Sequence, residues 1–248
     1  MKILGIESAS LTASAAIWED DMLTAEYTVN HKKTHSQTLL PMIDEIVRMT
    51  ETDLETLDAI AVSGGPGSFT GLRIGSATAK GLGQALDKPL IHVPTLDAMA
   101  YEHFGTDRLI CPMLDARREQ VYCGLYEFHE EFRVIRGQAA MGISELLSEV
   151  NGLGRPVVFL GDGVPVNRGR IMAECAVPYV FAPSFASRQR AGAVAALGAV
   201  YFLQGRTETA EEHKPEYLRM SQAERERQKR EQEERPGKEV FQKGAQGG

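Results

Sequence analysis

The sequence predicts an α/β protein built from two similar lobes, each with a mixed β-sheet and flanking helices. Two observations support this prediction. Short apolar strand patterns alternate with helical patterns in which apolar residues recur every three or four positions. The order of three strands, a helix, a strand and a helix also occurs twice along the 248 residues. We therefore predict one lobe over residues 1–105, a second over residues 106–220, and a charged tail, helical or disordered, over residues 221–248.

The first lobe begins with a β-meander and continues with a β-turn-α unit suited to a parallel sheet. Its strands are expected at residues 3–8, 13–18, 23–29, 57–62 and 89–93, and its helices at 35–49, 70–86 and 95–104. The second lobe repeats the plan with strands at 109–114, 120–128, 133–139 and 156–160, and helices near 143–150 and 187–203. In the tail, charges of both signs alternate, which is typical of a solvated segment and not of a nucleic-acid-binding arm.

Charge and cysteine content exclude several classes of protein. The 27 Lys and Arg residues are outnumbered by 34 Asp and Glu residues, so the formal net charge is -7. Because such a chain repels a polyanion, binding of nucleic acid by this chain alone is disfavoured. The three cysteines have no C-x-x-C spacing, and no run approaches the ~18 apolar residues of a membrane span. We therefore expect a cytoplasmic protein with no disulfide framework, zinc knuckle or membrane segment.

A glycine-rich loop joins a predicted strand to the helix that follows it. Loops of this kind can cradle phosphate through backbone N–H groups. Here neither the Walker spacing nor the G-x-G-x-x-G pattern fits, since Thr70 stands where the third glycine belongs. We therefore interpret the loop as structural: Gly64, Gly65 and Gly67 permit positive φ angles and tight packing, and Ser68 or Thr70 caps the helix.

Small residues recur every four positions along the helix after this loop. Glycines inside a helix cost up to ~1 kcal/mol each, so a stripe of them indicates close packing of another helix. That helix is either the neighbouring one at 35–49, which has one apolar face, or a helix of a partner or a second copy; the sequence leaves both interpretations open. The candidate docking residues are His35, Leu39, Leu40, Ile43 and Val47 on one helix and Gly71, Leu72, Gly75 and Ala79 on the other.

Patterns for catalysis or metal binding are weak. His31 and His35 are four residues apart but have no identifiable third ligand, so a role in helix entry is favoured. His129 is not part of an H-E-x-x-H motif, and the chain has no G-x-S-x-G motif. Cys111 and Cys123 lie in apolar strands, where packing is the usual role of a thiol. The residues themselves therefore indicate no nucleophile and no metal site.

Acidic turns occupy corresponding places in the two predicted lobes. Glu7 and Asp115 each end a first strand, and the glycine-rich segment 161–167 follows a later strand. In a duplicated meander plan, these are the positions at which actin-like ATPases hold phosphate, metal and adenosine. The pattern therefore favours an actin-like fold, and it supports nucleotide use only weakly.

Several segments together resemble one known family. They are residues 3–10, His35-Ser36-Gln37 leading into Leu39-Leu40-Pro41, the run SGGPGSFTGLRIG at residues 63–75, Asp115-Ala116-Arg117-Arg118, and Pro215-Glu216-Tyr217-Leu218-Arg219. The GPGSFTGLRIG-type segment is highly specific. From Met1 to about Arg227, the chain is similar to the TsaB (YeaZ) family of tRNA threonylcarbamoyladenosine biosynthesis proteins, which are paralogues of TsaD.

The resemblance implies an actin-like, ribonuclease H-like fold and a scaffold role beside the catalytic TsaD and the ATPase TsaE. In that family, TsaD transfers threonylcarbamoyl from its adenylate to N6 of adenosine 37 in tRNAs that read ANN codons. The first two helices are expected to form a helical bundle with TsaD, or with a second copy when TsaD is absent. We expect no catalytic residue, metal or intrinsic cofactor, a nucleotide only at a subunit boundary, and tRNA contact only through the complex.

Two departures from TsaD support a non-catalytic role. TsaD carries a metal through an H-x-x-x-H pair on a later helix of its first lobe, and residues 93–104 here offer no such pair. Asp162 replaces a glycine of the adenosine loop, which would place like charge near a phosphate. The alternatives are an actin-like kinase or ATPase that holds magnesium through Glu7 or Asp115, a metallopeptidase-like protein, and a plain homodimer.

Overall fold

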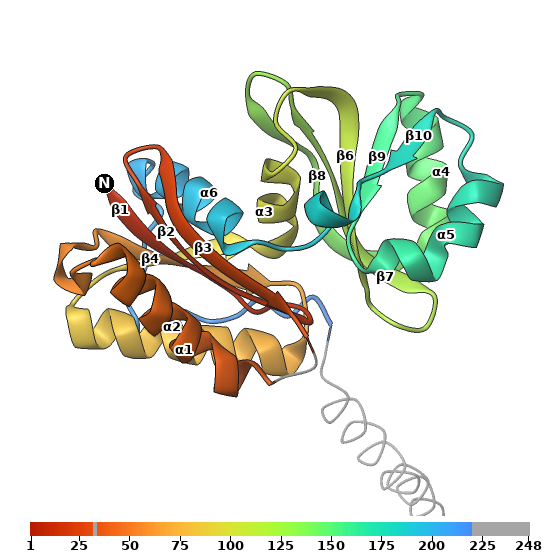
Figure 1. The fold of residues 1–248 in the computed structure, drawn as a ribbon. Helices are drawn as coiled ribbons and strands as arrows, with labels where there is room; N and C mark the ends of the chain where they lie inside the picture. Colours follow the sequence, from red (N-terminus) through yellow and green to blue (C-terminus); the bar gives the residue numbers. More distant parts are fainter. Residues whose placement is uncertain (32–33, 220–248) are drawn as a thin grey trace, which may run out of the picture. The chain divides into compact units, whose positions relative to one another are not determined.

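Two five-stranded mixed sheets form the framework of the chain in a computed structural model (Figure 1). The structure describes residues 1–31 and 34–219, so the predicted tail at 221–248 lies outside the described residues. Both sheets and their helices belong to one unit, Met1–Leu218.

The first sheet has the strand order β3-β2-β1-β4-β5. Its strands are β1 (Lys2–Glu7), β2 (Thr12–Glu19), β3 (Met22–Asn30), β4 (Ala59–Gly65) and β5 (Leu90–Pro94). The first three form the predicted antiparallel meander, while β4 pairs in parallel with β1, and β5 pairs in parallel with β4. Because β1 and β4 are covered on both faces, their sequences are almost continuously apolar. The register of this pair brings the end of β1 beside the start of the glycine-rich loop.

The second sheet repeats this order as β8-β7-β6-β9-β10. Its strands are β6 (Thr106–Asp115), β7 (Gln120–Phe128), β8 (Phe132–Gly142), β9 (Val157–Leu160) and β10 (Tyr179–Phe181). The helices α4 (Ile143–Leu153) and α5 (Gly163–Glu174) pack with it, and their apolar residues join those of the strands in one core cluster. Each sheet thus places its strands in the order third, second, first, fourth, fifth, which confirms the predicted duplicated, actin-like fold.

Helices cover both faces of the first sheet. The helices α1 (His35–Thr50) and α2 (Phe69–Leu86) pack side by side on one face, and α6 (Ala191–Leu203) covers the opposite face (Figure 1). Short 3-10 turns, η1 (Leu54–Thr56) and η2 (Ser184–Ala186), lie before β4 and before α6.

The position of α6 differs from the expectation that the helix near 187–203 belongs with the second lobe. The helix packs on the first sheet, where Val194 and Leu197 share a core cluster with Ile3. Small residues allow this close approach, because an added Cβ at Gly5 would collide with the backbone of α6, and one at Gly198 would lie 2.6 Å from a β4 side chain. The strands of the second sheet begin at Thr106, whereas the chain after η2 returns to the first sheet.

The helix α3 (Thr95–Tyr101) links the two lobes through a buried carboxylate. Asp97 accepts a hydrogen bond from the Tyr126 hydroxyl of β7 at 2.8 Å and one from the Tyr201 hydroxyl of α6 at 3.2 Å. Burial raises the pKa of Asp97, and the two tyrosine hydrogen bonds oppose that shift. One carboxylate thus joins helices of the first lobe to a strand of the second.

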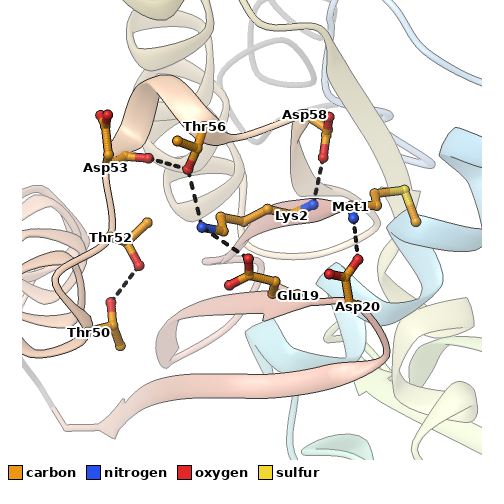
Figure 2. Close-up of polar contacts among 9 residues, drawn as sticks. All are labelled: Met1, Lys2, Glu19, Asp20, Thr50, Thr52, Asp53, Thr56 and Asp58. Carbon is orange, nitrogen blue, oxygen red and sulfur yellow. Dashed lines mark hydrogen bonds and ion pairs between the residues drawn. The ribbon is translucent and has the colours of Figure 1, made fainter.

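Polar contacts fix the start of β1 (Figure 2). The backbone N–H of Lys2 donates to Asp58 at 2.7 Å, and the Lys2 ammonium lies 3.2 Å from both Thr56 and Glu19. These contacts join β1 to β2 and to the segment before β4. Because they lie near the surface, we expect them to align the strands and to add little stability.

Candidate functional site

The glycine-rich loop between β4 and α2 is shaped by contacts that exclude side chains. An added Cβ at Gly64 would collide with the His92 ring, and one at Gly67 would collide with the carbonyl oxygen of Ala9. Gly65 has a φ angle of 115°, which favours glycine. Gly64 and Gly67 thus allow tight packing without a positive φ angle, and Gly65 supplies the positive φ angle of the loop.

Three N–H groups of this loop and of the helix start are bonded within the chain. Gly65 donates to Thr95 Oγ1 at 3.2 Å, and Ser68 donates to the Ala9 carbonyl at 2.6 Å. Gly71 donates to the Ser68 side chain at 3.3 Å, so Ser68 and not Thr70 is the cap of α2. A phosphate cradle needs free N–H groups that point at the ligand. The N–H groups of Gly65, Ser68 and Gly71 are therefore not available to a phosphate, although the loop stands where a phosphate-binding loop would be expected.

The C-terminal segment 206–218 lies over this loop; we call it the strap. The Glu216 N–H donates to the Gly64 carbonyl at 2.6 Å, and Tyr217 stacks on Phe69 with ring centroids 4.2 Å apart. From the second lobe, Gln138 of β8 donates to the Gly65 carbonyl at 3.1 Å and to the Glu216 carboxylate at 2.9 Å. The Pro215-Glu216-Tyr217-Leu218-Arg219 motif thus has a structural role, since it closes the loop from the solvent side.

The small-residue stripe of α2 faces the chain's own sheet, and this corrects the docking surface expected from the sequence. An added Cβ at Gly71 would collide with the Ser8 carbonyl, and one at Gly75 with the Ser8 hydroxyl. Leu72 and Ala79 are buried, with exposed fractions of 1% and 0%. The stripe is small because it packs directly on β1 and β4, so none of these residues is open to a partner helix.

The predicted apolar face of α1 is also mostly internal. Leu39 and Ile43 are buried in the first core cluster, and Val47 packs against that cluster. His35 begins α1, and its Nε2–H donates to the Ser10 carbonyl at 2.6 Å, which confirms its role in helix entry. Of the α1 residues expected to dock, Leu40 is open to solvent, with 54% of its surface exposed.

A second small-residue row does face outward on α2. Ala77, Gly81 and Ala85 are exposed and recur every four positions, and an added Cβ at Gly81 would meet nothing within 4 Å. We call these three residues, together with Leu40, the outer helix face. The sequence contains this row as plainly as the buried one. Only the packing of α2 on the sheet distinguishes them.

Glu7, at the end of β1, is fully buried. Its Oε1 accepts from the Ala9 N–H at 2.6 Å, while its Oε2 has no hydrogen-bond partner among the described residues. Burial raises the pKa of Glu7 to about 7, and the Ala9 N–H opposes that shift.

A polar cluster continues from this strand end toward α6. Ser10 donates to buried Gln189 at 3.0 Å, and Arg190 forms an ion pair with Glu26 of β3. Burial raises the pKa of Glu102 well above its usual value, and the Arg190 charge opposes this shift. This cluster was not predicted from the sequence, since polar residues in a loop or at a helix end, such as Gln189, Arg190 and Glu102, carry no periodic signal.

The acidic turn of the second lobe is organised differently. The Asp115 N–H donates to the Asp162 carboxylate at 3.0 Å, and the Asp115 carboxylate itself accepts from the Arg117 N–H at 2.8 Å. Burial raises the pKa of Asp162, and the Asp115 N–H and the Arg188 charge oppose that shift. Most of the segment 161–167, expected as a glycine-rich loop, is the first turn of α5.

The thiols expected to be structural lie in the core of the second lobe. Cys111 and Cys123 are fully buried, and burial raises the pKa of Cys123 to about 12. Neither can therefore act as a thiolate nucleophile at neutral pH. His129 is exposed beside Asp107, with its Nδ1 3.2 Å from the carboxylate.

Comparison with known proteins relates this geometry to one family. Residues 23–226 match the model of the family described as TsaD, tRNA N6-adenosine threonylcarbamoyltransferase. The tRNA threonylcarbamoyladenosine biosynthesis protein TsaB of Bacillus subtilis is 32% identical over 228 residues, covering 90% of this chain and 96% of the relative. TsaB of Escherichia coli is 37% identical over 133 residues, covering 52% of this chain and 57% of the relative.

A solved structure shares the whole fold. YeaZ from Pseudomonas aeruginosa superposes with a TM-score of 0.76 at 24% identity and covers 88% of this chain and 99% of its own. Together with the extent and level of the match to the Bacillus subtilis protein, this shows that the chain belongs to the TsaB (YeaZ) family of tRNA threonylcarbamoyladenosine biosynthesis proteins, within the larger family of the TsaD model.

Proposed function

We propose that this TsaB homologue is a non-catalytic scaffold subunit, which works with TsaD and TsaE to place threonylcarbamoyl on N6 of adenosine 37 in tRNAs that read ANN codons. Catalysis would belong to TsaD, and tRNA would be reached only through the complex. The cytoplasm remains the expected compartment. No described helix is long and apolar enough to cross a membrane.

One observation carries the non-catalytic part of the proposal: the N–H groups of Gly65, Ser68 and Gly71 are bonded within the chain. The loop at the phosphate position of the fold therefore stabilises the protein and leaves these donors unavailable to a ligand. On α3, the helix whose counterpart in TsaD is expected to hold a metal, Asp97 is already bonded to Tyr126 and Tyr201. These contacts favour a scaffold over an actin-like kinase or a metallopeptidase.

The docking surface we propose is the outer helix face. Its alanines and glycine offer little side-chain bulk, so a partner helix could approach α2 closely, and the exposed Leu40 would contribute apolar area beside it. This face replaces the buried stripe of Gly71, Gly75 and Ala79 as the contact for TsaD, or for a second copy of the chain when TsaD is absent.

Reconstitution of tRNA modification tests the proposal. Purified TsaD and TsaE are assayed with tRNA, threonylcarbamoyl donor and ATP, with and without this chain. We expect modified adenosine only when the chain is present. Gly81→Leu fills the outer helix face and should abolish both co-elution with TsaD and modification. A matched control is Gly169→Leu on α5, where the glycine is also exposed and its added Cβ would also meet nothing within 4 Å.

Three outcomes would contradict the proposal. Full modification by TsaD and TsaE alone would remove the need for a scaffold. Normal co-elution of the Gly81→Leu variant would exclude the outer helix face as the contact. Low-micromolar ATP binding by the isolated chain in calorimetry, lost in Glu7→Gln or Asp115→Asn, would favour the kinase alternative.

A further inference from the structure

Three potential metal ligands meet beneath the glycine-rich loop, away from the outer helix face. His92 lies on β5, whereas Glu208 and His213 lie on the strap. One ligand atom from each of the three lies within 4.8 Å of the other two. Within residues 1–31 and 34–219, no other group of three His, Cys, Asp or Glu side chains comes this close.

The backbone holds these side chains in place. Leu90 and Glu208 exchange two backbone hydrogen bonds, of 2.8 and 2.9 Å, which set the strap against the start of β5. The Lys80 ammonium donates to the His213 carbonyl at 3.2 Å and anchors the strap on α2. On the other side, Gly64 leaves the room that the His92 ring fills. The cluster is therefore positioned by three separate elements of the fold.

His213 has the hydrogen bonding expected of a metal-binding histidine. Its side chain is fully buried, and its Nδ1–H donates to Glu208 Oε1 at 2.5 Å. Its Nε2 has no hydrogen-bond partner among the described residues. A buried polar atom left unpaired costs about 1–3 kcal/mol, so this nitrogen needs a ligand that accepts its lone pair. In metal sites, a carboxylate commonly binds one ring nitrogen and leaves the other for the ion.

We propose that His92 and His213 bind a divalent transition-metal ion of the zinc class, with Glu208 as the carboxylate that orients His213. Imidazole nitrogens are ligands that zinc prefers, and water would complete the tetrahedron. Ligand atoms around zinc are about 3.3 Å apart, so side-chain rotations suffice to close the observed cluster. The ion would fasten the strap to β5 and so hold it on the glycine-rich loop.

Metal titration of the full-length chain tests the site. The protein is stripped with a chelator and titrated with Zn²⁺ alone by calorimetry, and Co²⁺ is added separately to record the visible absorption of a tetrahedral ion. We expect one ion per chain and a melting temperature that rises with Zn²⁺. We also expect slower tryptic cleavage after Arg206, at the exposed start of the strap, when Zn²⁺ is bound. Glu208→Gln, which keeps a hydrogen-bond acceptor for His213, should weaken binding at least tenfold.

The control is His129→Gln, which removes an exposed histidine of the second lobe and should leave the affinity for Zn²⁺ unchanged. His213→Gln should abolish binding, and its circular dichroism shows whether the variant folds. If it does not fold, Glu208→Gln and the Co²⁺ spectrum of the unaltered chain still decide the question. Failure of the unaltered chain to bind Zn²⁺ at micromolar concentration would overturn the proposal. Binding that is undiminished in Glu208→Gln would also overturn it.

Discussion

Replacing Gly71 or Gly81 of α2 by alanine should change the stability of the protein in opposite directions. In Gly71→Ala, the new Cβ would collide with the Ser8 carbonyl of the chain segment after β1, which cannot move without disturbing the sheet. Such overpacking costs about 1–3 kcal/mol. In Gly81→Ala, the Cβ enters open space, and the higher helix propensity of alanine stabilises the helix by up to ~1 kcal/mol. The two variants should therefore differ by about 1–4 kcal/mol in the free energy of unfolding.

Urea unfolding followed by circular dichroism measures this difference, and calorimetry provides the melting temperatures. For a protein of this size, each kcal/mol shifts the melting temperature by about 2–4 °C, so Gly71→Ala should melt lower and Gly81→Ala slightly higher than the unaltered chain. Equal stabilisation of both variants would mean that the stripe does not rest on the sheet. The orientation of α2, and with it the outer helix face, would then be refuted.

Three further predictions concern groups whose environment the structure defines. Because the folded pKa of Glu7, about 7, lies above its ordinary value of 4.5, this group binds a proton more tightly in the folded state, and its cost to stability develops as pH rises from about 4.5 to above 7. Glu7→Gln should therefore be more stable than the unaltered chain at pH 8, by up to about 3 kcal/mol, and the difference should shrink at pH 5. A difference in the free energy of unfolding that is the same at pH 5 and pH 8 would contradict this. Tyr217→Ala should lower stability by about 1 kcal/mol through loss of the aromatic stack, measured by urea unfolding, with no change in the second-lobe core. A thiol reagent should label Cys175 in the native chain before Cys111 and Cys123, since only Cys175 is partly exposed; equal labelling rates by mass spectrometry would disprove the burial.

The order of strands and helices as far as β9 was determined by the sequence because most of these elements carry their own periodic signal, whereas α5 and β10 were not predicted. Alternation in the first meander and the three- and four-residue spacing in α1 and α2 depend only on residues close together in the chain. The glycine-rich loop is also local, and its glycines and the Ser68 cap have the roles expected from their type. The family was identifiable for the same reason, since its most specific motif is a single continuous segment.

Which face of each element meets which neighbour was decided by the tertiary structure. Gly75 and Gly81 look alike in sequence, yet one rests on β1 and the other faces solvent, because orientation depends on how the whole helix packs. The sequence likewise gave no sign that α6 returns to the first sheet, or that His92 meets His213 across 121 positions. Long-range contacts of this kind arise when the core closes, and no local pattern records them.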